Sequence, residues 1–381
     1  MMPNGVAASD GERLPVVIRA MGMRDVPGLL GMRGGGVRLA LPEAQVSGYT
    51  PLRGLVQGRW NPLRGDRVRT YVACAKREPV AFIQTREHSP QQRHKWDILY
   101  IGASRGEAGA TAERRTELWT ALLDYTAAAA GRRGVQRLYA KTPQGSEVAE
   151  AFRTAGYVRY GEEALYAFYG QRAAGANPEH GADAELVPRA QTASDTWALH
   201  QLYALTAPKA VQFAEALTSH RWELPGQTLL PLARRPRESG LIVEHAGHEH
   251  EVAIYCRIGQ LGRRAWLEFV FDPAERAHLE PTIGAILRSL APGPGERIYC
   301  AVREFQRELG GALEAQGFAL AGLQDLLVRY TTVTARAPAL RLVRLPLRER
   351  RFVGIPAQGS LQRGGTRTPH RPSVNSSARS R

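Results

Sequence analysis

The stretch Val17-Ile18-Arg19-Ala20 and the Asp25 that follows it return later as Val187-Pro188-Arg189-Ala190 and Asp195. Further short matches keep the same order along the chain: Arg59-Trp60 with Arg221-Trp222, Pro79-Val80-Ala81-Phe82-Ile83 with Glu251-Val252-Ala253-Ile254-Tyr255, Arg137-Leu138-Tyr139 with Arg297-Ile298-Tyr299, and Gly156-Tyr157 with Gly317-Phe318. A constant order at an offset of about 160 to 170 residues indicates two copies of one domain. Each copy has an ordinary domain length, whereas solenoid repeats span only about 20 to 50 residues.

Length and composition are compatible with two folded domains. The chain has 381 residues, of which 43% are hydrophobic, enough for two cores. No stretch approaches the roughly 18 apolar residues of a membrane helix, and residues 1–13 lack the apolar core of a signal peptide. Cys74, Cys256 and Cys300 each lie in an apolar run, which favours small core residues over a disulfide or zinc framework. We expect a cytoplasmic protein without membrane association.

The basic charge is concentrated in the C-terminal tail. Of the formal net charge of +15, residues 336–381 supply +10, because they carry eleven arginines and one acid, Glu349. From Gly354 onward the tail is rich in Gly, Ser, Pro and Arg, which predicts disorder. A basic tail can bind nucleic acid through counterion release. The alternative is a solvated appendage, so we expect nucleic acid binding through this tail or not at all.

The apolar patterns predict the same element order, β, α, β, β, β, α, β, α, β, in each copy. In the first copy the main predicted elements are strands at 14–20, 67–75, 80–85, 96–101, 136–140 and 165–169 and helices at 111–130 and 146–154. In the second copy strands are predicted at 240–244, 251–258, 265–271, 297–302 and 324–330. The predicted organisation is a disordered segment 1–13, a domain 14–170, a linker 171–185, a domain 186–335 and a largely disordered tail 336–381.

These elements and motifs resemble the GNAT acetyltransferase superfamily. The strand ending in Arg19-Ala20 before Asp25, the hairpin residues Pro79-Val80-Ala81-Phe82 and the pair Gly156-Tyr157 are similar to its motifs, and the second copy repeats them. The resemblance covers about residues 14–170 and 186–332. It implies an α/β (α+β) fold of two tandem GNAT-like domains, each a mixed, mostly antiparallel sheet flanked by helices. It also implies acyl transfer from acyl-CoA.

In this family the pyrophosphate of acyl-CoA binds in a loop of pattern Arg/Gln-x-x-Gly-x-Gly/Ala, before the main helix. Backbone N–H groups at a helix N-terminus favour an anion, and glycines let phosphate approach them. The resemblance places this loop in the first copy. Its expected acyl-CoA residues are Ile101, Ala103, Arg105, Gly106, Gly109, Ala110 and Thr111. The alternative is a turn of small residues that only caps the helix.

The matching loop of the second copy departs from the pattern. Arg276 stands at the leading position, but Leu279 and Pro281 replace the glycines, and Glu280 adds a negative charge. Because Pro281 has no N–H and Leu279 adds bulk, we expect no acyl-CoA there. The sequence 272–275, Asp-Pro-Ala-Glu, predicts a capping box that closes the helix start internally. The second copy would then pack on the first or shape a substrate site.

Catalysis needs a base for the amine proton and an acid for the leaving thiolate. The resemblance points to a base on the strand before the loop, where Asp97 is the carboxylate, with Glu268 as its rough counterpart in the second copy. The alternative is that Asp97 lies at a solvated strand entrance. The position of the family's acid tyrosine holds Phe152 and Leu313, neither of which donates a proton. Tyr157 is the predicted substitute, with Tyr160 as its alternative, unless both are core residues.

A group of three histidines and a pair of arginines can each be interpreted in a structural or a functional way. His245, His248 and His250 either bind a metal or lie in a solvated turn; we predict the turn and no metal. Arg132 and Arg133 either contact a nucleotide phosphate or complement the C-terminus of the preceding helix.

The predicted function is N-acyltransferase activity, most simply acetyl transfer from acetyl-CoA to a small-molecule or peptide amine. The alternatives are a non-catalytic GNAT-like scaffold and, less favoured, an aminoacyl-tRNA-dependent transferase.

Overall fold

The computed structural model describes residues 15–32, 36–39, 67–87, 94–104, 111–170, 188–224, 237–245, 251–293 and 295–331. The chain divides into a compact unit, Met1–Thr334, and a C-terminal segment, Ala335–Arg381. The predicted N-terminal segment 1–13, linker 171–185 and tail 336–381 lie outside the described residues. Their disorder and the proposed domain boundaries therefore stay predictions.

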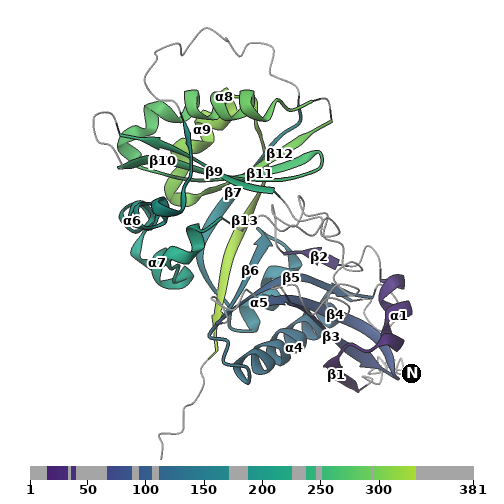
Figure 1. The fold of residues 1–381 in the computed structure, drawn as a ribbon. Helices are drawn as coiled ribbons and strands as arrows, with labels where there is room; N and C mark the ends of the chain where they lie inside the picture. Colours follow the sequence, from purple (N-terminus) through teal and green to yellow (C-terminus); the bar gives the residue numbers. More distant parts are fainter. Residues whose placement is uncertain are drawn as a thin grey trace, which may run out of the picture. The chain divides into compact units, whose positions relative to one another are not determined.

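The described strands form one sheet (Figure 1). Its order is β1 (Val16–Ala20), β3 (Arg67–Ala75), β4 (Glu78–Glu87), β5 (Lys95–Ala103), β6 (Arg137–Pro143), β13 (Ala319–Tyr330), β7 (Val158–Phe168), β12 (Arg297–Arg303), β11 (Arg264–Phe271), β10 (Val252–Leu261), β9 (Arg237–Glu244) and β8 (Arg189–Ala190), while β2 (Gly36–Arg38) pairs with β5 off this path. Neighbours are antiparallel except β5 with β6 and β11 with β12. The predicted mixed, mostly antiparallel sheet is confirmed.

The two halves, β1 to β7 and β8 to β13, exchange their last strands. β13 of the second half lies between β6 and β7 of the first, and β7 of the first lies beside β12 of the second. One row of paired residues runs across these four strands: Gln324 of β13 pairs with Pro143 of β6 and with Glu163 of β7, and Glu163 pairs with Arg303 of β12. Each half therefore completes its sheet with a strand of the other.

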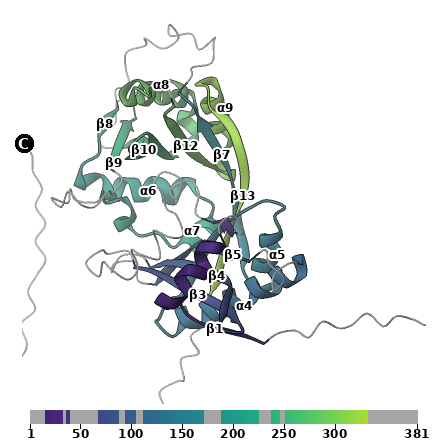
Figure 2. The ribbon, with the colours of Figure 1, turned by 90° about the vertical axis from the view of Figure 1, so that its right-hand side faces the viewer.

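Helices cover both faces of each half (Figures 1 and 2). In the first half α4 (Ala112–Gly131) and α5 (Glu147–Thr154) pack on one face, and α1 (Val26–Gly31) packs on the other. In the second half α8 (Leu279–Leu290) and α9 (Arg307–Ala315) cover one face, and α6 (Thr196–Thr206) covers the other. Helix α7 (Lys209–Glu215) follows α6 and contacts β7 of the first half.

Five 3-10 turns connect these elements in the described residues: η1 (Met23–Asp25), η4 (Ala193–Asp195), η5 (Ser219–Trp222), η6 (Pro273–His278) and η7 (Glu304–Gln306). Cys74, Cys256 and Cys300 are buried and free, which confirms their interpretation as core residues. None of the described helices is long and apolar enough to cross a membrane.

The repeated arginine and aspartate have a structural role in both halves. Arg19 donates to both carboxylate oxygens of Asp25, at 2.7 and 2.6 Å, and the Gly22 N–H donates to Asp25 at 2.6 Å. Arg189 and Asp195 make the same pair at 2.9 and 2.8 Å. The pair fixes the corner between the first strand and first helix of each half, which explains why the motif occurs twice.

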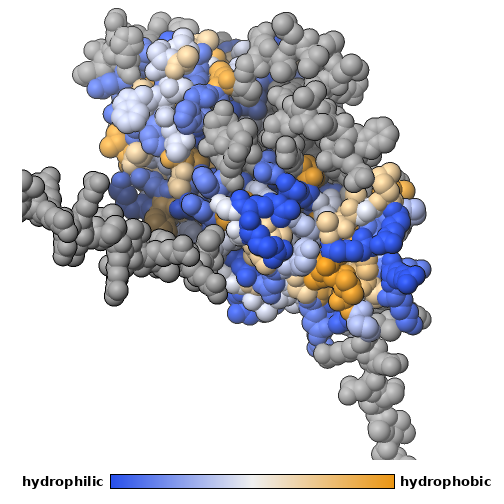
Figure 3. Space-filling model, turned by 60° about the horizontal axis from the view of Figure 1, so that its bottom comes forward, coloured by the Kyte–Doolittle hydropathy of each residue, from blue (hydrophilic) through white to orange (hydrophobic). Residues whose placement is uncertain are grey.

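The large exposed hydrophobic side chains do not form one continuous surface on the face drawn in Figure 3, where orange patches alternate with hydrophilic residues. The most exposed are Leu205, Phe213, Val17 and Trp197. They belong to β1, α6 and α7, and single exposed hydrophobic residues of this kind are normal on protein surfaces.

Candidate functional site

Each half contains two parallel strands that pair only at their beginning. In the first half β5 and β6 pair from Lys95–Arg137 to Asp97–Tyr139 and then separate; we name this point the first fork. In the second half β11 and β12 pair as far as Leu267–Cys300; we name this point the second fork. Where parallel strands separate, backbone N–H and C=O groups lose their partners in the sheet. An extended chain that carries amides can pair with them, as in β-strand addition.

The first fork is occupied by the chain's own strand β2. Gly36, Val37 and Arg38 pair with Gly102, Ile101 and Tyr100 of β5. The next residue, Leu39, joins both arms of the fork: its N–H donates to the carbonyl of Leu99 at 3.0 Å, and its carbonyl accepts from the N–H of Lys141 on β6 at 3.0 Å.

The second fork is closed differently. The side-chain amide of Gln306, which is buried, donates to the carbonyl of Phe269 on β11 at 2.9 Å. Gln306 belongs to η7, directly after β12. A side chain of the same half thus satisfies the group that the fork would otherwise leave without a partner.

The two forks also differ in the shape of the strand. The pairing of β4 with β5 shifts between Gln84 and Thr85, and Leu99 is the additional residue of this bulge. As a result Leu99 and Tyr100 both pack towards α1, whereas Ile98 and Ile101 pack towards α4. The pairing of β10 with β11 has no such shift. Bulges redirect side chains and occur frequently beside functional sites.

The predicted acyl-CoA loop is described only at its two ends. The side chains of Ile101 and Ala103 are fully buried in the core under α4, so these residues offer backbone groups only. Thr111 is the exposed N-cap of α4, and its hydroxyl accepts from the N–H of Arg114 at 3.2 Å. Arg105, Gly106, Gly109 and Ala110 lie outside the described residues, and their role in binding acyl-CoA stays a prediction.

Asp97 lies on β5 at the base of the first fork, on the sheet face opposite α4. Arg86 of β4 donates to its carboxylate at 2.7 Å.

The counterpart of Asp97 in the second half follows from the strand register. In the parallel pairing, Asp97 is opposite Tyr139 and Trp266 is opposite Tyr299. Because Tyr139 and Tyr299 are equivalent in the repeat, the counterpart of Asp97 is Trp266. The expectation of Glu268 is corrected: it lies farther along β11, where it accepts from Arg221 at 2.7 Å.

Tyr157 lies on the other face of the sheet. It is buried in the core of α4 and α5, with its ring edge-on to Phe152 at 4.8 Å. Burial raises the pKa of Tyr157 far above its usual range. Its hydroxyl has no hydrogen-bond partner among the described residues. The structure therefore does not bring Tyr157 and Asp97 together, and their catalytic roles stay predictions. The hydroxyl of Tyr160 instead donates to Glu215 at 3.5 Å.

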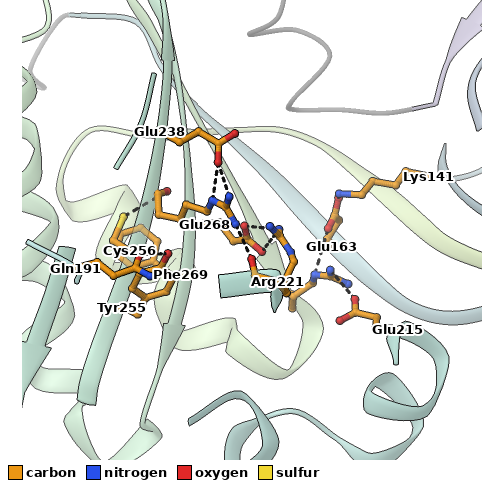
Figure 4. Close-up of polar contacts among 12 residues, drawn as sticks. Lys141, Glu163, Gln191, Glu215, Arg221, Glu238, Tyr255, Cys256, Glu268 and Phe269 are labelled. Carbon is orange, nitrogen blue, oxygen red and sulfur yellow. Dashed lines mark hydrogen bonds and ion pairs between the residues drawn. The ribbon is translucent and has the colours of Figure 1, made fainter. Parts of the chain in front are cut away.

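A buried charged cluster lies where the halves exchange strands (Figure 4). Glu163 of β7, with 1% of its side chain exposed, accepts from Lys141 at 2.7 Å and from Arg303 at 3.4 Å, and it also accepts from Gln324. Arg303 in turn donates to Glu215 of α7 at 2.7 Å. The repeat places Glu163 and Gln324 at equivalent positions, but only the exchange reveals that they touch, so sequence reasoning missed this cluster.

Helix α7 is attached to the first half by its C-terminal carbonyls. The ammonium of Lys95 donates to the carbonyl of Glu215 and, at 2.8 Å, to that of Ala216. The hydroxyl of Tyr139 donates to the carbonyl of Ala214 at 2.7 Å. Burial lowers the pKa of Lys95 to about 8. The second half thus contributes a helix end beside the base of the first fork.

The second-half loop satisfies its own polar groups. Asp272 accepts from the N–H of Ala274 at 2.9 Å, as an N-cap should. Glu275 does not complete the predicted capping box; its carboxylate instead contacts His245 at 2.9 Å and His278 at 2.6 Å. Glu275 thus pairs with two histidines in the turn that precedes α8. The expectation that this loop binds no acyl-CoA stays a prediction.

The remaining sequence clusters are the histidines at 245–250 and the pair Arg132-Arg133. His248 and His250 lie outside the described residues, and within the described ones no group of His, Cys, Asp and Glu is arranged to hold a metal ion. Arg133 donates to the carbonyl of Ala129 at 2.9 Å, near the end of α4. This contact corresponds to the ligand-free interpretation of Arg132 and Arg133, in which they complement the helix C-terminus.

Within the described residues, both halves show the element order β, α, β, β, β, α, β, α, β, and the described part also contains β2 in the first half and a further helix, α7, in the second. This is the order that the apolar patterns predicted for each copy, and it is the order in which the chain resembles the GNAT superfamily. The fold is a tandem GNAT-like fold.

No family model and no curated protein matches the sequence. Among solved structures, the chain is similar to a tandem GNAT protein from the clavulanic acid biosynthesis pathway, with 13% identity, a TM-score of 0.49, and 84% of this chain and 99% of that chain covered. It is similar to a GCN5-related N-acetyltransferase from Sphaerobacter thermophilus, with 14% identity, a TM-score of 0.47, and 84% and 97% covered. A putative acetyltransferase from Pyrococcus horikoshii has 11% identity, a TM-score of 0.41, and 87% and 93% covered.

Proposed function

We propose that the tandem GNAT-like protein transfers an acyl group, most simply acetyl, from acyl-CoA to an amine, with the donor bound at the first fork. The observation that carries the proposal is the difference between the forks. The first is bulged at Leu99 and, among the described residues, is occupied by the short segment 36–39. The second is regular and closed by the buried side chain of Gln306.

The chemistry of the donor suits the first fork. The pantetheine arm of acyl-CoA is extended and carries two amides, so it can pair with strand edges as a peptide does. Its phosphates suit the N-terminus of α4, which begins after the loop that ends at Thr111. A donor held in this way has its thioester near the base of the fork, at the end where Asp97 lies.

Acyl transfer replaces one bond with another. The amine nitrogen attacks the thioester carbonyl, the carbon–sulfur bond breaks, the amine loses a proton and the thiolate gains one. Asp97 is the proposed base, and its hydrogen bond from Arg86 would orient its carboxylate. We keep the acceptor as a small-molecule or peptide amine and the compartment as the cytoplasm, where acyl-CoA is made and used.

The donor site is tested by calorimetric titration of acetyl-CoA. The titration is made on the wild type and on Val37→Pro, in which proline weakens the pairing of β2. The variant is included because β2, when it occupies the fork, could prevent acetyl-CoA from binding to a site that does exist. Gly109→Glu, which places a carboxylate in the predicted phosphate loop, should weaken binding at least about tenfold. The matched control is Gly311→Glu in α9, where an added side chain meets open space.

The outcomes separate the candidates. Binding that Gly109→Glu abolishes and Gly311→Glu leaves intact would support the donor site and justify a screen of amines. No heat and no rise in Tm with either the wild type or Val37→Pro would overturn it. The second candidate, a non-catalytic binding or scaffold protein, would then be favoured, since β2 would be a permanent part of the sheet.

Binding of RNA is a separate question, because most of the net charge lies in the tail. Deletion of residues 336–381 tests it. Loss of RNA binding with unchanged unfolding would assign RNA to the tail, whereas RNA binding by the shortened chain would favour an aminoacyl-tRNA-dependent transferase.

A further inference from the structure

We infer that β2 is a self-inhibitory strand: residues 36–39 compete with acyl-CoA for the same backbone groups of the first fork, so that the donor binds only when β2 is displaced. The inference rests on the proposed function, because it assumes that the donor binds at this fork. It goes beyond that function by assigning a regulatory role to a segment of the chain.

The first support is position. β2 pairs with β5 at Tyr100, Ile101 and Gly102, directly beyond the point where β5 leaves β6. Leu39 then spans the two arms with one hydrogen bond to each. A carbonyl or N–H that already pairs with β2 in the plane of the sheet is blocked to an amide of the donor, so the two occupants exclude each other.

The second support is the nature of the attachment. β2 has three paired residues, at the lower limit of strand length. Its anchor is Leu39, of which only 1% is exposed and which packs in the core under α4 together with the half-buried Val37. A short strand held by Leu39, Val37 and a few backbone bonds can detach as a unit while β4, β5 and β6 remain in place.

The third support is the comparison with the second fork. There the occupant is the side chain of Gln306, whose backbone belongs to the turn between β12 and α9. Its removal would leave the buried carbonyl of Phe269 without a donor unless the whole turn moved. One molecule therefore contains a fork with a fixed occupant and a fork with a removable one.

A reversible lock tests the inference. Val37 and Ile101 are directly opposite each other in the antiparallel pair and both face the core under α4. Directly opposed positions bring Cα atoms to about 4.5 to 5.5 Å, within the range of a disulfide. In Val37→Cys/Ile101→Cys, oxidation should fix β2 in the fork and reduction should release it. The wild type treated in the same way controls for its own cysteines, which are buried and free.

We expect acetyl-CoA to bind the reduced variant at least about tenfold more tightly than the oxidised one. Val37→Pro should bind more tightly than the wild type by a similar factor. The matched control is Val17→Pro. Val17 is the second residue of the short edge strand β1, away from the fork, and this variant should bind as the wild type does. Equal binding by the oxidised and reduced variants would overturn the inference and leave the proposed function intact.

The unmodified protein provides a measurement that does not depend on any variant folding. Hydrogen exchange of the peptide that contains residues 36–39 should rise when acetyl-CoA is added at saturation, because β2 leaves the sheet. Unchanged protection with bound acetyl-CoA would overturn the inference. If no variant binds acetyl-CoA although circular dichroism shows each to be folded, the donor site itself is rejected, and the inference with it.

Discussion

Glu163 and Gln324 face each other on adjacent strands at equivalent positions of the two halves, and the amide of Gln324 donates to the carboxylate of Glu163. Both side chains are buried. Two glutamates there would place like charges in contact, and two glutamines would leave Lys141 and Arg303 without their shared carboxylate. The different residues at these two equivalent positions therefore suit the pairing of the last strands.

Gln324→Glu should destabilise the protein strongly. The substitution buries a second carboxylate against Glu163, and we expect a loss of about 3 kcal/mol in the free energy of unfolding at pH 7. The loss should shrink at acidic pH, where the two groups can share a proton. Urea unfolding measures it. Gln201→Glu on the exposed face of α6 is the control, and equal effects of both substitutions would contradict the prediction.

Acid should weaken the two strand-to-helix corners. The hydrogen bonds from Arg189, joined by those from Thr192, lower the pKa of Asp195 from 3.8 to about 2. A carboxyl with a lowered folded-state pKa adds stability above its ordinary pKa and loses it as pH falls towards the folded value. We expect Asp195→Asn to cost about 2 kcal/mol at neutral pH and almost nothing near pH 2.

The pH series is measured by urea unfolding of both proteins. Glu251→Gln, an exposed carboxylate in the loop before β10, is the control and should follow the wild type throughout. A cost of Asp195→Asn that does not change between pH 7 and about pH 2 would show that the corner is not held by the charged carboxylate.

Alkaline pH should raise the free energy of unfolding through Lys95, because its partly buried ammonium is costly in the folded chain. Burial lowers the pKa of Lys95 from 10.5 to about 8, so the unfolded chain binds more protons than the folded one between these values. The contribution of Lys95 to stability therefore rises with pH across that interval. Because the side chain is partly exposed, we expect a rise of about 1 kcal/mol. Lys95→Arg, which does not titrate there, should lack it; parallel pH profiles of the two proteins would contradict the assignment.

Neither half should fold alone. A fragment of residues 1–175 contains every element of the first half but lacks β13, which lies between its β6 and β7. We expect this fragment and a fragment of residues 180–381 to be unfolded separately and to form a one-to-one complex when coexpressed. Circular dichroism and size-exclusion chromatography measure this. Deletion of residues 336–381, which removes no described strand, is the control, and cooperative unfolding of the first fragment by itself would refute the prediction.

The sequence was sufficient for most of the elements and for their duplication, because these are local signals. Alternation predicted β3, the turn after it predicted β4, and the repeated Arg19 and Asp25 marked the start of each copy. The exchange of β7 and β13 could not be predicted, since either strand satisfies the local pattern in either half. β2 was not predicted for a different reason: its three residues follow a run of glycines and are too few to show a hydrophobic periodicity.

The candidate site was predictable only in part. Asp97 does lie at the base of a fork, but its partner Arg86 depends on the register of β4 with β5. Tyr157 follows the family's motif in sequence and yet lies across the sheet from Asp97. Which face a residue takes depends on the bulge at Leu99 and on neighbours far along the chain, and neither is visible in a short motif.

The exchanged strands have a consequence for how such a chain can change over generations. A duplicated copy that loses its chemistry is normally free to be deleted. Here the sheet of the first half is incomplete without β13, so deletion of the second half would also remove a strand from the first. The loop that holds Leu279 and Pro281 can therefore vary in sequence only as long as the strand that follows it later in the chain is kept.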